Sequence, residues 1–203
     1  MAKAIQSMEL EYAVITSVTR DDLPDGGSEH LAKIVKQVKE QIPGITIELL
    51  VPDFKGSENA LKTVMEAGPD VLNHNIEAPE SLYPLINRPP GNYRISLDLL
   101  AAAKKMGALT KSGMMIGLGE NKKDILDTLK DLRRSGCDLL TIGQYLQPSA
   151  DHLSVATYHS PELFDELKER ALDMGFINAE CGPLVRSSYN AFKMYQSVQE
   201  KAN

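Results

Sequence analysis

Several residues that could bind a ligand stand at the ends of short apolar stretches. Asn73, His74 and Asn75 are three consecutive hydrogen-bonding side chains in the apolar run 71–76, and Glu77 follows them. Polar groups inside a strand cost free energy unless each finds a partner. Alternation along a strand sends Asn73 and Asn75 to one face and His74 to the other. We therefore expect the asparagines to form a polar shelf for a ligand, with a buried structural network as the alternative, and interpret His74 as a structural histidine.

A second polar group follows the apolar run 12–18. The segment TSVTRDDLPDGG at 16–27 places Arg20, Asp21 and Asp22 after this run and ends in turn-forming residues. Charged connections of this kind are common between strands and helices. Taken alone, the segment is explained more simply as a solvated loop than as a binding loop.

The glycine-rich segment GLGE at 117–120 could bind a ligand through its backbone. It follows an apolar run and precedes a helical pattern, which resembles half of a dinucleotide-binding fingerprint. The third glycine of that fingerprint does not follow at the required place, so nicotinamide binding is weakly supported. Two glycines would still let the backbone approach an adenine or ribose closely.

For the other reactive side chains, the surrounding sequence gives little support for a catalytic role. Lys111 could form a Schiff base, as in some barrel aldolases, but a salt-bridged or solvent-facing lysine is the simpler interpretation. The segment CGPLVRSSY at 181–189 lacks the G-x-S-x-G pattern and partner histidine of a serine hydrolase. His30, His152 and His159 show no metal-ligand spacing, and we interpret them as non-catalytic.

The elements that must position these residues alternate in type. Apolar runs typical of buried strands lie at 12–18, 45–51, 71–76, 111–118 and 139–142. Amphipathic patterns typical of helices lie at 28–41, 59–67, 97–106, 122–135 and 161–174. This order predicts an α/β fold with a parallel sheet, either a (β/α) barrel or an open doubly wound sheet. Polar residues gather at the carboxyl ends of successive strands, which favours the barrel.

The beginning of the sequence departs from a complete βα pattern. Residues 1–8 look like the last turns of a helix that leads into the strand at 12–18. We therefore expect a partial barrel whose first strand is missing. A single domain is expected over 1–203, with a barrel core at about 1–175 and a C-terminal capping segment at about 176–203.

Composition excludes several classes of protein. The 203 residues carry a net charge of −6 and no basic cluster, which argues against nucleic-acid binding and against a polybasic membrane surface. No apolar run reaches the roughly 18 residues of a membrane span, and the N-terminus lacks a signal-peptide pattern, so we expect a cytoplasmic protein. Two cysteines, Cys137 and Cys181, are too few for a disulfide framework or for an iron–sulfur site built from this chain's thiolates alone.

Six segments together resemble the central and C-terminal part of lipoyl synthases, which are radical S-adenosylmethionine (SAM) enzymes. They are VITSVTRDDLPDGG at 14–27, VPDF at 51–54, DVLNHNIE at 70–77, TKSGMMIGLGE at 110–120, GQYLQPS at 143–149 and CGPLVRSSY at 181–189. The resemblance implies a partial (β/α)6 TIM-type barrel of the radical SAM kind. It also implies two [4Fe–4S] clusters. One cleaves SAM to a 5′-deoxyadenosyl radical, which abstracts hydrogens from C6 and C8 of a protein-bound octanoyl chain, and the auxiliary cluster donates the sulfur.

The resemblance assigns roles to individual residues. Ser188, the second serine of RSSY, would be the serine ligand of the auxiliary cluster, and Arg186 would lie near that cluster. We accordingly expect Arg186 and Ser188 to be catalytic, with Ser188 also a metal ligand. The residues expected to bind SAM are Ser17, Asp21, Asn73, Asn75, Gly117, Leu118, Gly119 and Glu120.

The cysteine triads of the family, C-x4-C-x5-C and C-x3-C-x2-C, do not occur in this sequence. This chain is therefore not expected to assemble either cluster alone, and Cys137 and Cys181 are interpreted as packing cysteines. Three explanations fit this departure: a truncated sequence, a split enzyme whose cysteines lie on a separate polypeptide, and a degenerate paralogue.

The resemblance also implies partners. These are octanoylated lipoyl-carrier domains, such as the glycine cleavage H protein and 2-oxoacid dehydrogenase E2, and an electron donor such as ferredoxin or flavodoxin. A separate cysteine-bearing polypeptide is a further expected partner. Two alternatives remain open: a cluster-free barrel enzyme, such as a Schiff-base aldolase using Lys111, and a non-catalytic subunit that binds lipoyl-carrier domains.

Overall fold

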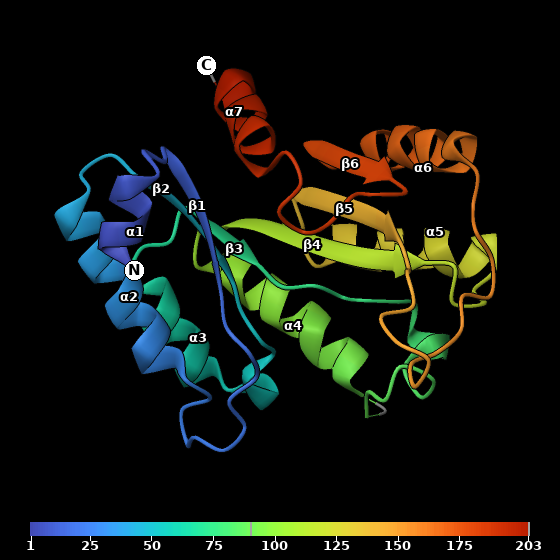
Figure 1. The fold of residues 1–203 in the computed structure, drawn as a ribbon, viewed down its shortest axis with the longest axis horizontal. Helices are drawn as coiled ribbons and strands as arrows, with labels where there is room; N and C mark the ends of the chain where they lie inside the picture. The colour runs from blue at the N-terminus through green and yellow to red at the C-terminus, as the bar shows by residue number, and fades with distance from the viewer. Residues whose placement is uncertain (90, 203) are drawn as a thin grey trace.

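The computed structural model describes residues 1–89 and 91–202, and within them six strands form one parallel sheet (Figure 1). The strands are β1 (Tyr12–Thr16), β2 (Thr46–Leu50), β3 (Val71–Asn73), β4 (Leu109–Ile116), β5 (Leu139–Gln144) and β6 (Asn178–Gly182). Each strand pairs with the next one along the chain, and Tyr12, for example, lies opposite Thr46. A strand order without reversal is that of a (β/α) barrel and not of a doubly wound sheet. The prediction of an α/β partial barrel is confirmed.

The helices are α1 (Ala2–Ser7), α2 (Ser28–Gln41), α3 (Glu58–Met65), α4 (Asn92–Lys105), α5 (Lys122–Arg134), α6 (Pro161–Asp173) and α7 (Ala191–Ala202), with short 3₁₀ helices η1 (Phe54–Gly56) and η2 (Glu80–Leu82). Helices α2 to α6 connect the strands, and all the helices except α7 pack around the outside of the curved sheet (Figure 1). Leu31, Val35 and Val38 are buried along α2 at helical spacing. Among the described helices, none is long and apolar enough to cross a membrane.

The structure differs from the sequence-based expectation mainly at the C-terminal end. Both β6 and α7 lie in the segment from about 176 that was expected to cap the barrel, and β6 continues the same sheet by pairing Leu139 with Asn178. In β6, Ala179 is buried and its neighbours are half-buried, so no apolar run marks this strand. Helix α4 begins at Asn92 and not at 97, and its first turn buries Tyr93.

A buried polar network crosses the inner face of the sheet. The Nζ atom of Lys111 on β4 lies 3.0 Å from both carboxylate oxygens of Glu48 on β2, and neither side chain is exposed. The Tyr12 hydroxyl and the Asn73 amide each donate to this carboxylate at 2.6 Å. Burial lowers the pKa of Lys111, and the contact with Glu48 opposes that shift. The network accounts for the polar residues inside otherwise apolar strands.

Helix α7 lies at the opening between the edge strands β1 and β6 (Figure 1). The ring of Tyr12 on β1 lies 5.7 Å from that of Phe192 and 5.9 Å from that of Tyr195, measured between centroids. Asn178 of β6 donates to the hydroxyl of Ser197 at 2.8 Å. The last helix therefore contacts both edges of the open barrel.

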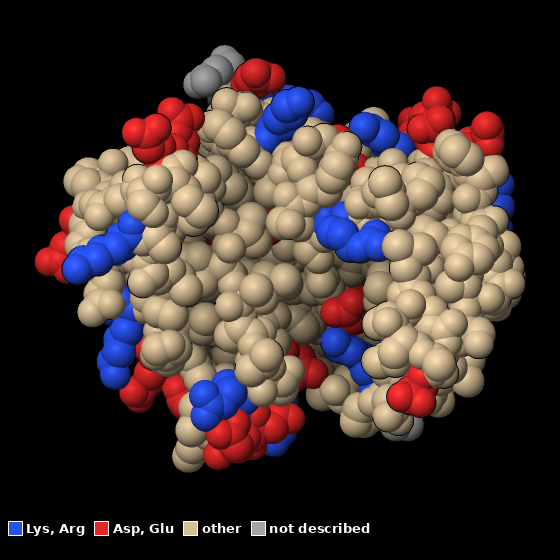
Figure 2. Space-filling view, in the orientation of Figure 1, with Lys and Arg blue, Asp and Glu red and all other residues tan. Residues whose placement is uncertain are grey.

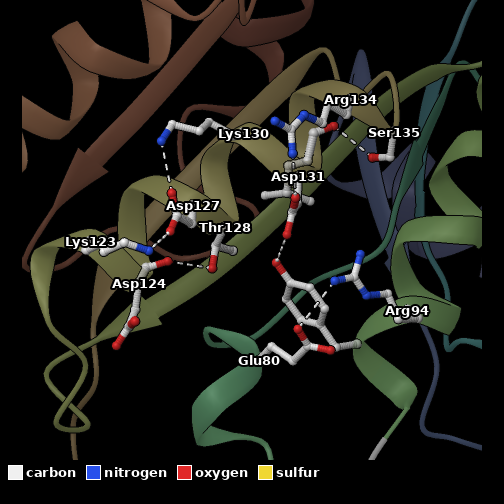
Figure 3. Close-up of polar contacts among 12 residues, drawn as sticks. Glu80, Arg94, Lys123, Asp124, Asp127, Thr128, Lys130, Asp131, Arg134 and Ser135 are labelled. Carbon is white, nitrogen blue, oxygen red and sulfur yellow. Dashed lines mark hydrogen bonds and ion pairs between the residues drawn. The ribbon is translucent and has the colours of Figure 1, made fainter.

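On the outer side, polar contacts fasten α5 to its neighbours (Figure 3). The hydroxyl of Tyr93 on α4 donates to Asp131 of α5 at 3.1 Å. Along α5, Asp127 pairs with Lys123 and Lys130 at 2.5 and 2.9 Å, and these hydrogen bonds lower the pKa of Asp127 to about 2. Asp131 thus links α5 to α4, whereas the ion pairs of Asp127 lie within α5.

Candidate functional site

The carboxyl ends of β1, β2 and β3 border a cavity of about 570 Å³ at the mouth of the barrel. Ser17 follows β1, Asp21 lies in the next loop, and Asn75 and Glu77 follow β3. The remaining polar lining residues are Thr16, Thr19, Asp53, Lys55, His74, Asn87, Arg88 and Asn92. This cavity, called the main cavity below, lies where barrel enzymes place their active sites.

A smaller cavity of about 170 Å³ shares Asn75 and Glu77 with the main cavity. It lies at the ends of β4 and β5, and its far wall is the C-terminal segment at 185–187. Its other lining residues are Gly113, Met114, Met115, Thr141, Gly143, Val185, Arg186 and Ser187. The two cavities together bring segments from the whole sequence to one edge of the sheet.

Glu77 stands between these two cavities. Its backbone N–H donates to Gly113 at 3.1 Å and its carbonyl accepts from Met115 at 2.8 Å, which fixes the residue beside β4. Its carboxylate lies 3.4 Å from the Arg88 guanidinium. Burial raises the pKa of Glu77, and the charge of Arg88 opposes that shift. A half-buried carboxylate in a cleft with a raised pKa is typical of a functional site, and the sequence did not predict this role for Glu77.

Asn75 joins the main cavity to the C-terminal segment. Its Nδ2 lies 2.9 Å from the Ser187 Oγ, which in turn donates to Asn75 Oδ1 at 3.1 Å. Arg186 lines the small cavity, and its Nη1 donates to the carbonyl of Val185 at 2.6 Å. Ser188 lies elsewhere, in an open hollow of about 560 Å³ beside β1 and α7. The structure therefore brings Arg186 and Asn75 together and places Ser188 apart from both cavities.

The asparagines of the predicted polar shelf divide between two environments. Asn75 lines both cavities, whereas Asn73 is fully buried and bonded to Glu48 in the inner network. Within the described residues, Asn73 Oδ1 has no hydrogen-bond partner. His74 points the other way and contacts the Val51 carbonyl at 2.9 Å and the Ser96 hydroxyl at 2.8 Å. Burial lowers the pKa of His74, and its interpretation as a structural histidine is confirmed.

The turn at 117–120 lies at the end of β4 but lines neither cavity. The carboxylate of Glu120 accepts from the Gly117 N–H at 2.6 Å, and the Gly117 carbonyl accepts from Ala156 at 2.8 Å. A Cβ added at Gly117, where φ is +105°, would lie 2.1 Å from Nε2 of Gln144. In this structure the glycine makes room for another part of the chain. SAM binding by Gly117, Leu118, Gly119 and Glu120 stays a prediction.

The side chains described here do not fit an iron–sulfur cluster. In residues 1–89 and 91–202, no group of three or more His, Cys, Asp or Glu residues is arranged to hold a metal ion. Cys137 is buried and Cys181 half-buried, and burial raises the pKa of both thiols to about 12. Both are therefore protonated at neutral pH, whereas iron is bound by thiolates.

Lys111 is also unsuited to Schiff-base chemistry. Its ammonium group is fully buried, is held by Glu48 and lines neither cavity. An amine that attacks a carbonyl must be accessible and neutral. The geometry supports the salt-bridge interpretation and not the aldolase alternative.

Charges on the face containing α7 and the strand ends are interspersed. Figure 2 shows acidic and basic side chains beside one another, without a continuous area of either sign. Ligand binding on this face would rest on specific contacts and not on a long-range field.

Comparison with known proteins places the chain among radical SAM enzymes. Residues 1–132 match the model of the Radical SAM superfamily. The chain is 48% identical to the lipoyl synthase of Rubrobacter xylanophilus, with 100% of this chain and 63% of that protein covered. It is 48% identical to the Chlorobaculum parvum lipoyl synthase, with 100% and 69% covered, and 52% identical to that of Vibrio atlanticus, with 99% and 63% covered. The chain thus spans about two thirds of the length of these relatives.

Solved structures show the same fold at low sequence identity. Methylornithine synthase superposes with a TM-score of 0.62 at 15% identity, covering 86% of this chain and 50% of that one. The HMG-CoA lyase of Brucella melitensis gives a TM-score of 0.53 at 15% identity, covering 98% and 69%. These likenesses support the barrel architecture alone.

Proposed function

The chain belongs to the lipoyl synthase family of the radical SAM superfamily, and we propose that it supplies the SAM-binding part of an enzyme that inserts sulfur at C6 and C8 of a protein-bound octanoyl chain. The observation that carries this proposal is the pair of adjoining polar cavities at the strand ends, walled on one side by the segment that contains RSSY. Three residues expected to bind SAM, Ser17, Asp21 and Asn75, line the main cavity.

The chemistry of the main cavity suits a zwitterionic nucleoside ligand. SAM carries an ammonium group, a sulfonium group, a carboxylate and ribose hydroxyls. Asp53 and Glu77 offer carboxylates to the cationic and hydroxyl groups, and Arg88 and Lys55 offer cations to the carboxylate. Asn75 supplies an amide that both donates and accepts. This mixture of signs fits such a ligand better than it fits a polyanion.

The iron–sulfur clusters, when bound, would supply the reducing electron and the inserted sulfur. Because this chain's thiols do not fit a cluster, the cysteine ligands would come from outside these 203 residues, and a cysteine-bearing polypeptide is a proposed partner. The roles of Ser188 as a cluster ligand and of Arg186 beside the auxiliary cluster are proposals from the family resemblance. Octanoylated lipoyl-carrier domains and a ferredoxin or flavodoxin are the other proposed partners.

Equilibrium dialysis against radiolabelled SAM tests the proposed site. The wild-type chain should bind SAM, and Asn75→Ala should bind about tenfold more weakly, as expected for the loss of a hydrogen bond in a partly buried site. Asn59→Ala is the matched control, because Asn59 is exposed on α3 and lines neither cavity. No binding by the wild-type chain, or equal binding by Asn75→Ala, would contradict the proposed site.

A further inference from the structure

The C-terminal segment at 183–188 passes directly over the end of β5. A Cβ added at Gly143 would lie 2.2 Å from the Val185 carbonyl oxygen and 3.2 Å from Nη1 of Arg186. No side chain fits in such a space, since real Cβ atoms do not approach a backbone oxygen that closely. A glycine inside an apolar strand is typical of a place where another backbone comes close. The segment at 183–188 therefore packs directly against the backbone of Gly143.

A second glycine, Gly113, makes room for Asn75, the residue to which Ser187 of this segment is bonded. A Cβ added at Gly113 on β4 would lie 2.9 Å from Asn75 Oδ1 and 2.5 Å from the Thr141 hydroxyl. Gly113 thus leaves room beside β4 for the Asn75 amide, which is bonded to Ser187. The contact between Asn75 and Ser187 joins residues 112 positions apart in the sequence.

We propose that Ser187 is a positioning residue, which holds the segment at 183–188 across the barrel mouth by bonding both polar atoms of the Asn75 amide. The segment's other hydrogen bonds near this point are local, since Arg186 donates to the carbonyls of Pro183 and Val185. Val185 is buried, its N–H donates to the Gly182 carbonyl at 3.1 Å, and turns occupy 183–184 and 187–190 before α7. The pair therefore places Arg186 against the small cavity.

The pair also links this segment to ligand binding, and this step rests on the proposed function. An amide side chain has two N–H donors and two acceptor lone pairs. Ser187 uses one of each, and the Asn75 amide also lies within hydrogen-bonding reach of the Glu77 carboxylate. SAM would therefore bind the remaining acceptor of Asn75, or take the place of Glu77 at its second donor. A ligand that fixes Asn75 also fixes Ser187, and this coupling acts equally in both directions.

Hydrogen–deuterium exchange of the backbone amides at 183–190 tests the positioning role in the ligand-free chain. Ser187→Ala should raise their exchange rates about tenfold, the usual worth of a lost hydrogen bond. Ser187→Thr, which keeps the hydroxyl, should exchange like the wild type. Ser188→Ala is the matched control, since the neighbouring hydroxyl has no part in the pair. The β5 amides serve as an internal reference for an intact sheet.

A double variant separates a direct pair from two independent effects. Asn75→Ala with Ser187→Ala should exchange no faster than either single variant, because both remove the same interaction. The proposal would be overturned if the rate increases of the two single variants multiply in the double variant, or if Ser187→Ala and Ser188→Ala exchange at equal rates.

Addition of SAM distinguishes this inference from the proposed function. SAM should slow exchange at 183–190 in the wild type and leave Ser187→Ala unaffected. If dialysis shows binding and both proteins respond alike, the coupling is wrong while the SAM site stands. If SAM does not bind, but Ser187→Ala loosens the segment and Ser187→Thr does not, the proposed function fails while the positioning role stands.

Discussion

Lys111→Met tests the buried network inside the barrel. In the wild type, the Lys111 ammonium contacts both oxygens of the Glu48 carboxylate at 3.0 Å, with no exposure of either side chain. The variant leaves Glu48 charged in the same place without a counter-charge. Removal of one partner from a buried ion pair costs about 3–5 kcal/mol of the free energy of unfolding, because the remaining charge stays desolvated.

The rest of the network sets where in this range the loss should fall. Tyr12 and Asn73 still donate to Glu48, each at 2.6 Å, and hydrogen bonds to a charged group are worth about 1.5–3 kcal/mol each. We therefore expect a loss of about 3 kcal/mol. Adding Glu48→Gln removes the charge and keeps an acceptor for Tyr12, so the double variant should regain roughly 1–2 kcal/mol over Lys111→Met.

Urea unfolding followed by far-ultraviolet circular dichroism measures these values, since the chain has no tryptophan. Lys123→Met is the control. It removes an ion pair with Asp127 in which the lysine is 82% exposed, and such surface pairs are worth about 0–1 kcal/mol. The account of the network is refuted if Lys111→Met loses no more than this control, or if the double variant is less stable than Lys111→Met.

Two further predictions concern the strand ends. Gly143→Ala should push the segment at 183–188 away from β5, because its Cβ would meet the Val185 oxygen at 2.2 Å. We expect faster amide exchange in this segment and a loss of about 1–3 kcal/mol in the free energy of unfolding from overpacking. Exchange at the wild-type rate would contradict this prediction. For Glu77, burial raises the folded-state pKa above its ordinary value of 4.5. The stability from its protonated form is therefore complete below that value and is lost as the pH rises through the folded-state pKa. Glu77→Gln should flatten this decline in urea titrations from acidic to neutral pH, and an unchanged pH profile would show that Glu77 does not cause it.

The sequence predicted most of the fold because buried parallel strands and amphipathic helices leave strong periodic patterns. The run at 139–142 and the helical pattern at 122–135 correspond to β5 and α5. Strand β6 escaped prediction because it is an edge strand, largely half-buried and without an apolar run. Its place in the sheet depends on pairing with β5, which local composition does not encode.

The sequence predicted where the candidate site lies, at the carboxyl ends of the strands, but not which residues contact one another there. Strand alternation separated His74 from the two asparagines, but it did not show that Asn73 belongs to an inner network while Asn75 lines the cavities. The bond between Asn75 and Ser187 depends on how distant segments meet. Glycines 113 and 143, inside apolar strands, were the available sign of that close approach.

Reconstitution tests the central claim most directly. The chain is incubated with iron and sulfide, with and without a polypeptide that carries the two family cysteine triads, and then receives SAM, a reductant and an octanoyl-lysine peptide. The account predicts cluster absorption, 5′-deoxyadenosine and sulfur-containing peptide only when the triad polypeptide is present, with less 5′-deoxyadenosine from Asn75→Ala. Clusters assembled by this chain alone, or clusters formed in the mixture without cleavage of SAM, would contradict it.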